Sequence, residues 1–231
     1  MPEHRYPELD ALRGIAVWMM VLYHLLFDLA YFYGVQIPIY DGGWRIFARA
    51  AASLFLLLVG ICFVISWNRA PQRGAPTTYG KYLRRGLLIF AGGMVISLAT
   101  YLIAGDMYVR FGALHLIGFS TLLLPFFTPL KKWNALLGLF IITFTPSHFH
   151  TFTPSLDYFP LLPWSGVILV GMALGSILYA PSQQPILQKF DHVPYPRSLL
   201  WSGRRSLWIY FVHQPVLLLL LSVALGLPIP D

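Results

Sequence analysis

Seven apolar segments divide the chain, and most of them have the length of a membrane-spanning helix. A helix needs about 20 apolar residues to cross a hydrocarbon core of about 30 Å, so the fifth segment is short. Hydrophobic residues make up 57% of the 231 and charged residues only 11%, against about a quarter charged in soluble domains. The sequence therefore predicts an all-α, polytopic transmembrane helix bundle with about seven spans. The segments are 11–33, 44–67, 86–104, 111–127, 133–144, 163–180 and 206–226.

Basic residues are distributed unevenly between the connections. With the N-terminus in the cytoplasm, all but three of the 16 Lys and Arg residues lie on the cytoplasmic side, the exceptions being Arg45, Arg49 and Arg110. This asymmetry predicts a cytoplasmic N-terminus and an external C-terminus. The connections are short or rich in Pro and Gly, which favours one membrane domain over residues 1–231. We attribute the charge of +7 to topology and anionic membrane lipids, so nucleic acid is not an expected partner.

The stretch from Leu9 to Leu29, which contains most of the first apolar segment, carries Asp10, Arg13, His24 and Asp28. On a helix with about 100° per residue, Arg13 lies about 20° from His24, and both aspartates lie about 40° from it. The four groups therefore share one stripe. An Asp or Arg at a helix centre costs roughly 2.5 to 3.5 kcal/mol on insertion scales, so the stripe should face a bundle interior or a water-filled cavity.

His24 and Asp28 are the candidate catalytic pair. A carboxylate bonded to one imidazole nitrogen fixes the tautomer and makes the other nitrogen a better base. Two other interpretations stay open: Asp28 pairs with Arg45 or Arg49 to tie two helices, or the stripe relays protons in a transporter.

Polar residues in later segments add further candidates. His115 should lie at the level of His24 and either joins the catalytic site or serves as a core hydrogen-bonding group. His213 and Gln214 precede Pro215, so they either satisfy carbonyls that the proline frees or contact a ligand. His148 and His150 lack a third ligand at a recognisable spacing, so no metal is expected. The aromatic segment 157–164, ending at Trp164, could form an interfacial belt or a sugar-stacking platform.

Five motifs carry a resemblance to a known family. Residues 9–14 read LDALRG, and ten residues separate Arg13 from His24, which resembles the first-span signature of the transmembrane acyltransferase superfamily. Together with SLFLLLVG, FGALHLIG, FPLLPW and GRRSLWIYFVHQP, this is similar to the bacterial branch of the heparan-α-glucosaminide N-acetyltransferase family. The resemblance covers nearly the whole chain.

The resemblance implies transfer of an acetyl group from cytoplasmic acetyl-CoA to an amino or hydroxyl group of an external carbohydrate. It places the protein in the bacterial inner (plasma) membrane as a multi-pass enzyme, and self-association into a homo-oligomer stays open. In the animal enzymes the catalytic His precedes the Trp that opens the second span, whereas Asp41-Gly-Gly43 precedes Trp44 here. His24 or His115 must then replace that histidine. Expected CoA-binding residues are Arg13, Arg84, Arg85, Arg204, Arg205, His213 and Gln214.

The same scheme leaves the outer basic and aromatic residues for the acceptor. Expected acceptor-binding residues are Arg45, Arg49, Arg110 and Trp164. The alternative function is a small proton-coupled transporter or flippase that uses His24 and Asp28 as a proton relay.

Overall fold

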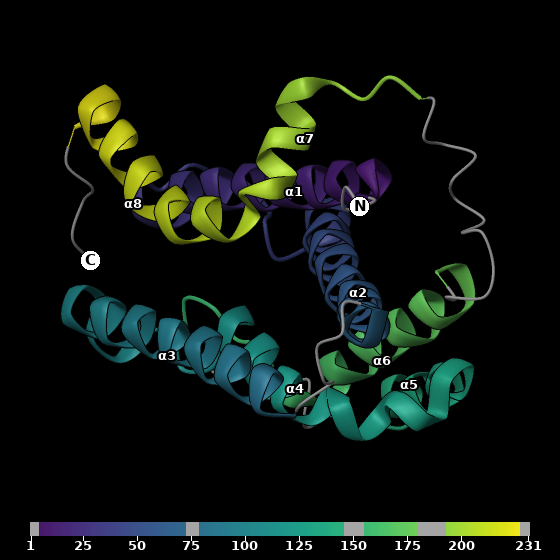
Figure 1. Cartoon of the computed structure of the whole chain (residues 1–231). Helices are drawn as coiled ribbons and strands as arrows, with labels where there is room; N and C mark the ends of the chain where they lie inside the picture. Colours follow the sequence, from purple (N-terminus) through teal and green to yellow (C-terminus); the bar gives the residue numbers. More distant parts are fainter. Residues whose placement is uncertain (1–4, 73–78, 146–154, 180–192, 227–231) are drawn as a thin grey trace. The chain divides into compact units, whose positions relative to one another are not determined.

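The computed structural model describes residues 5–72, 79–145, 155–179 and 193–226. In these ranges the chain is helical, and the described residues contain no strand apart from a single bridge between Phe111 and Tyr158. The predicted all-α class is confirmed (Figure 1). The helices are α1 (Pro7–Phe32), α2 (Gly42–Gln72), α3 (Tyr79–Ala104), α4 (Ala113–Phe127), α5 (Asn134–Phe144), α6 (Leu161–Leu178), α7 (Arg197–Arg204) and α8 (Ser206–Leu225), with the 3-10 helices η1 (Gly105–Met107) and η2 (Thr128–Trp133).

Each of the seven predicted apolar segments is mostly helical where the structure describes it. Among the described residues, six helical stretches are long and apolar enough to cross a membrane. The number is six because the fourth and fifth predicted segments fall in one continuous stretch, Ala113–Phe144. The short amphipathic helix α7 was not predicted.

The stretch from α4 to α5 is bent back on itself. Lys131, inside η2, has a φ of 46° and interrupts the helical path. The N–H of Leu156 donates to the carbonyl of Met107 at 2.7 Å, and the N–H of Phe159 donates to the carbonyl of Phe111 at 2.7 Å. Residues that precede α4 therefore lie beside residues that follow α5. The chain runs out along α4 and returns, so this stretch is not a single long rod.

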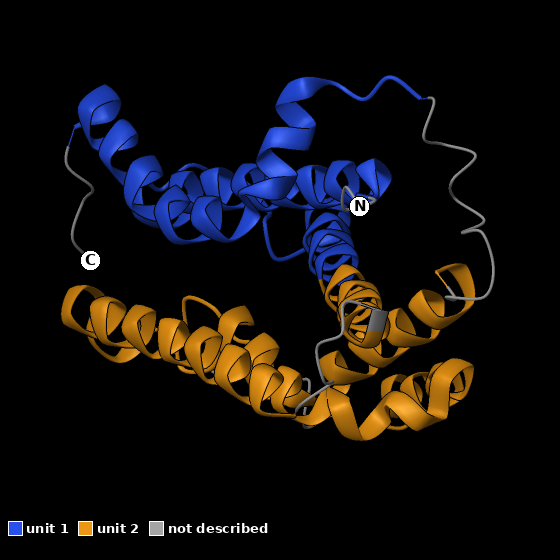
Figure 2. Cartoon of the chain, in the orientation of Figure 1, with its two compact units in different colours: residues 1–55, 187–231 blue, residues 56–186 orange. Residues whose placement is uncertain are grey.

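Two compact units make up the chain, and each is described by itself (Figure 2). Unit 1 contains residues 1–55 and 187–231, and unit 2 contains residues 56–186. In unit 2, α3 packs on α4 and α5 packs on α6. Leu116, Ile168 and Met172 are among its most buried side chains. One membrane domain over residues 1–231 stays a prediction.

In unit 1, α1 packs against α7 and α8. The approach of α1 to α7 is so close that only glycine fits at two positions. A Cβ at Gly203 would overlap the backbone carbonyl of Asp10, and a Cβ at Gly14 would overlap the carbonyl of Leu199. Small residues of this kind let membrane helices pack backbone to backbone. The contact fixes how the polar stripe of α1 meets α7 and α8.

Candidate active site

The polar stripe of α1 faces α7 and α8. Asp10 meets α7, whereas His24 and Asp28 meet α8. Asp10, Arg13, His24 and Asp28 thus share one face of α1, as their spacing predicted. They divide into two clusters, and His24 lies about 16 Å along the helix from Arg13 at a rise of 1.5 Å per residue.

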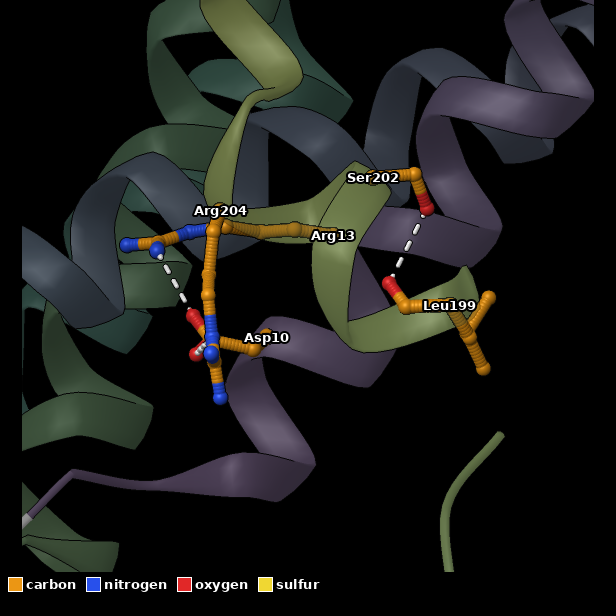
Figure 3. A network of polar contacts seen from close by, with 5 residues as sticks. All are labelled: Asp10, Arg13, Leu199, Ser202 and Arg204. Carbon is orange, nitrogen blue, oxygen red and sulfur yellow. Dashed lines mark hydrogen bonds and ion pairs between the residues drawn. The ribbon is translucent and has the colours of Figure 1, made fainter. Parts of the chain in front are cut away.

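The first cluster consists of Asp10, Arg13 and Arg204, and we call it the Asp10 cluster (Figure 3). The Asp10 carboxylate accepts from Arg13 Nη1 at 3.4 Å and from Arg204 Nε at 3.2 Å. Asp10 is buried, whereas the Arg204 side chain is 49% exposed. The terminal nitrogens of Arg204 make no bond to the described residues, so they can still donate to an anionic ligand. On α7, Ser202 Oγ donates to the carbonyl of Leu199 at 2.9 Å.

The second cluster consists of His24, Asp28, His213 and Gln214, and we call it the two-histidine cluster. The His24 and His213 rings are 4.8 Å apart between centroids and meet edge to face at 79°. Gln214 Nε2 donates to Asp28 Oδ1 at 2.6 Å. Asp28 is fully buried and His213 is 8% exposed.

The predicted bond between His24 and Asp28 is absent among the described contacts, and the predicted pairing is wrong. His24 Nδ1 lies 2.9 Å from the carbonyl of Met20, and Asp28 bonds Gln214 instead. Both side chains are engaged elsewhere: the His24 ring bonds the preceding turn of α1, and the Asp28 carboxylate accepts from a donor on α8. The alternative pairing of Asp28 with Arg45 or Arg49 is also absent among the described residues, because both arginines are exposed whereas Asp28 is buried and bonds Gln214.

The hydrogen-bond partners define the tautomers of His24 and His213. A carbonyl only accepts, so a ring nitrogen bonded to one must carry the proton. His24 Nδ1 bonds the Met20 carbonyl, and His213 Nδ1 bonds the carbonyls of Tyr210 at 2.7 Å and Ile209 at 3.2 Å. In both neutral rings, Nε2 therefore holds the lone pair. His213 does bond backbone carbonyls, as one interpretation expected, although the carbonyl that Pro215 leaves without its helical donor belongs to Phe211.

Three buried polar atoms of the two-histidine cluster have no hydrogen-bond partner among the described residues. They are Asp28 Oδ2, His213 Nε2 and Gln214 Oε1. Native proteins rarely leave such atoms unpaired, because an unmade bond in a buried site costs about 1 to 3 kcal/mol. Unpartnered atoms that gather in one place are expected where a ligand supplies the missing partners.

His115 has the opposite tautomer and a structural environment. Its Nδ1 accepts the N–H of Gly112 at 3.1 Å, which leaves the proton on Nε2, and Nε2 lies 3.4 Å from Ser97 Oγ. Phe111 stacks on the ring and Phe90 meets it edge to face. Both ring nitrogens are therefore occupied. The interpretation of His115 as a core hydrogen-bonding group fits this geometry better than a role as a base.

The other predicted site residues are scattered over the two units. Arg84 and Arg85 are exposed on α3 of unit 2, while Arg205 lies on unit 1 with its guanidinium 5.3 Å from the Trp201 ring. In unit 2, Arg110 donates to the Asp106 carbonyl at 3.3 Å, and Trp164 packs on Phe159 at 5.1 Å. The grouping of these residues into binding sites stays a prediction. His148 and His150 lie outside the described residues.

Asp157 carries a partly buried carboxyl group that was not among the predicted site residues. Its Oδ2 accepts the N–H of Ala113 at 3.4 Å, at the first turn of α4. Burial raises the pKa of Asp157 to about 7, although the N–H groups of Ala113 and Tyr158 act in the opposite direction. Asp157 therefore titrates near neutral pH where the returning chain docks on α4.

Gln214 was predicted as a CoA ligand or as a group that satisfies carbonyls, and not as the partner of Asp28. The predicted partners of Asp28 were charged or titratable groups, but a neutral amide fills that place. Its position directly after His213, inside an otherwise apolar run, was the available signal.

Comparison with known proteins identifies one relationship. The family model described as heparan-alpha-glucosaminide N-acetyltransferase, catalytic, matches residues 5–215. The match includes every residue of both clusters. Comparison with curated proteins gave no match, and comparison with solved structures gave none.

Proposed function

Because the chain belongs to the heparan-alpha-glucosaminide N-acetyltransferase family and is a membrane acetyltransferase, we propose that it takes acetyl from cytoplasmic acetyl-CoA. The acceptor is an amino or hydroxyl group of a carbohydrate on the outer side of the bacterial inner membrane. This assignment rests on the family and on the predicted orientation of the helices.

One observation supports the chemistry most strongly: His24 has a free lone pair on Nε2. Its Nδ1 proton is held by the carbonyl of Met20, so the ring has one orientation and one tautomer. A histidine held this way can accept a proton from an attacking nucleophile, a step that typically contributes 10²- to 10⁴-fold to the rate. Asp28, one helical turn away, favours the resulting imidazolium through its charge without bonding to the ring.

The acetyl group moves in one direct displacement. The acceptor nitrogen or oxygen attacks the thioester carbon while its proton passes to His24 Nε2. The carbon–sulfur bond then breaks, and the sulfur leaves with the proton that His24 returns. Direct transfer needs no acetyl-histidine intermediate.

The arginines on the predicted cytoplasmic side of the membrane are suited to the phosphates of CoA. Phosphates favour multidentate guanidinium donors. Arg204 keeps both terminal nitrogens available while Asp10 accepts from its Nε. Arg13 binds the same carboxylate, and Arg205 is the next residue after Arg204 in the chain. Arg84 and Arg85 on α3 stay proposed CoA-binding residues because of their predicted cytoplasmic position. His213 and Gln214 offer acceptor atoms at their free positions, so we assign them away from the phosphates.

On the outer side, the acceptor site is assigned to Arg45, Arg49, Arg110 and Trp164. Arginine donors suit sugar hydroxyl and carboxyl groups, and a tryptophan face can stack on a sugar ring.

The decisive experiment measures transfer of labelled acetyl from acetyl-CoA to D-glucosamine and to D-glucose by the purified protein in detergent. Wild type should acetylate at least one acceptor, and His24→Gln should lose at least about 100-fold in rate while still binding acetyl-CoA. A proton-coupled transporter gives no reason for acetyl-CoA to bind. Absence of both transfer and acetyl-CoA binding in folded wild-type protein would reject the proposal in favour of transport.

A further inference from the structure

The two-histidine cluster contains two imidazoles with free lone pairs, although the proposed acetyl transfer uses only that of His24. His24 Nε2 and His213 Nε2 both hold lone pairs because both Nδ1 atoms donate to backbone carbonyls. The ring centroids are 4.8 Å apart, so the two rings touch, and a small group placed beside their edges would be near both. His213 Nε2 is buried and has no partner among the described residues.

The free atoms of the cluster are all acceptors when Asp28 is ionised. They are the two imidazole Nε2 atoms, Asp28 Oδ2 and Gln214 Oε1. Gln214 has already given an N–H to Asp28. A ligand that satisfies these atoms must bring donors, and a cation would also compensate the buried Asp28 charge, which is costly while unpaired.

A primary ammonium group meets both conditions. It carries three N–H donors and one positive charge. Within the described residues, no group of three His, Cys, Asp or Glu side chains could hold a metal ion, so the protein's own geometry does not point to a metal as the cation. A neutral hydroxyl group brings only one donor and no charge.

Resting on the proposed acetyl transfer, we infer that His213 is a second catalytic base, which removes the first proton from an ammonium acceptor bound against the edges of His213 and His24. Acetylation of an ammonium group releases two protons in sequence. The first, taken by His213 Nε2, makes the amine nucleophilic and then leaves to solvent. The second is taken by His24 Nε2 during attack and is passed to the departing CoA sulfur, so the products are an amide, the thiol and one proton.

The groups that face His213 come from two helices. From α1, His24 contacts its ring, and Asp28 lies one turn further along that helix. From α8 itself, the Tyr210 ring is 5.7 Å away. Tyr23 lies beside His24 at 6.2 Å. Asp28 is the only acid among these groups, and its charge offsets the proton that either imidazole receives.

The kinetic test compares His213→Gln with His24→Gln, using D-glucosamine and saturating acetyl-CoA at pH 7 and pH 9. An amine near electron-withdrawing groups loses its proton at about pH 8, as α-amino groups do. At pH 9 the acceptor no longer needs the first base. His213→Gln should be at least about tenfold slower than wild type at pH 7 and within about threefold at pH 9. His24→Gln should stay slow at both values.

A merely structural role for His213 predicts an equal loss at both pH values, and that outcome would overturn the inference. Absence of transfer in wild type itself would instead count against the proposed function, so the two failures are distinguishable.

A second measurement needs no turnover. Nitrogen NMR of the ¹⁵N-histidine-labelled protein at pH 8 should show Nε2 unprotonated in His24 and His213 and protonated in His115, which serves as the internal control. Addition of D-glucosamine should shift the Nε2 signals of His24 and His213 and leave that of His115 in place. A proton on His213 Nε2 in the free protein, or no shift on adding D-glucosamine, would exclude the proposed role.

Discussion

At the residue scale, the hydrogen bond between Gln214 and Asp28 is the contact whose loss should lower the free energy of unfolding most. Gln214→Leu leaves Asp28 buried without its donor, which should cost about 1 to 3 kcal/mol of stability. The double variant Asp28→Leu with Gln214→Leu should be less destabilised than the Gln214→Leu single variant, because no polar group is left unpaired. Thermal unfolding of the two single variants and the double variant measures this coupling. Additive losses would show that the bond contributes nothing to folding.

Asp157 gives a pH-dependent prediction. Burial raises the pKa of its carboxyl from 3.8 to about 7 in the folded protein. The protonated form is therefore favoured by folding, and this stabilisation is complete below pH 3.8 and is lost as the pH rises through about 7. Asp157→Asn, which cannot ionise, should unfold a few degrees higher than wild type at pH 8 and show no such advantage at pH 4.

The control for Asp157 is Asp41→Asn, at an exposed carboxyl group outside the helices. Its melting temperature should follow that of wild type at both pH values. An Asp157→Asn curve parallel to wild type across this range would mean that the carboxyl group is solvated in the folded protein.

At the element scale, α2 and α3 offer matched pairs of exposed arginines for testing the CoA site. Replacing Arg84 and Arg85 by Gln should weaken acetyl-CoA binding at least about tenfold, because a hydrogen bond to a charged group contributes about 1.5 to 3 kcal/mol. Replacing Arg45 and Arg49 by Gln removes the same charge and should leave that binding unchanged. Calorimetric titration of both double variants makes the comparison. Equal affinities would assign Arg84 and Arg85 to topology alone.

The sequence predicts which residues share one face of a helix, but it does not predict which residues of other helices contact that face. A spacing of 3.6 residues per turn placed Asp10, Arg13, His24 and Asp28 on one stripe of α1, and the structure shows that stripe in contact with α7 and α8. The identity of Gln214 as the partner of Asp28 depends on how two helices 186 residues apart in sequence are aligned, which periodicity does not encode. The predicted pairing of His24 with Asp28 failed because each side chain has another partner, the Met20 carbonyl for His24 and Gln214 for Asp28, and the spacing within α1 does not reveal either.

The bend between α4 and α5 was also visible in the sequence only as two apolar segments. Its return depends on backbone hydrogen bonds from Leu156 and Phe159 to Met107 and Phe111. Backbone groups are the same in every residue, so no side-chain pattern marks these bonds in advance.

At the scale of the whole molecule, the bend between α4 and α5 favours seven membrane crossings over six. α5 has 11 residues and is only about 16 Å long at 1.5 Å per residue, yet the chain after it returns to the level at which α4 begins. Seven crossings place the two ends of the chain on opposite sides of the membrane. Reporter enzymes fused after Gly80, after Lys132 and after Gly226 should report cytoplasm, cytoplasm and exterior. A cytoplasmic signal after Gly226 would mean six crossings.

The unpaired atoms of the two-histidine cluster also affect how the protein must be handled. A ligand that binds only the folded state adds RT ln(1 + [L]/Kd) to the free energy of unfolding, which is about 2.7 kcal/mol at 100 times Kd. Asp28, His213 and Gln214 keep buried atoms unmatched until such a ligand arrives. The ligand-free protein then has the lowest free energy of unfolding. Extraction from the membrane with acceptor sugar present should therefore extend the lifetime of the folded protein in detergent. In a cell, the supply of acceptor would in the same way influence how much of the enzyme escapes degradation.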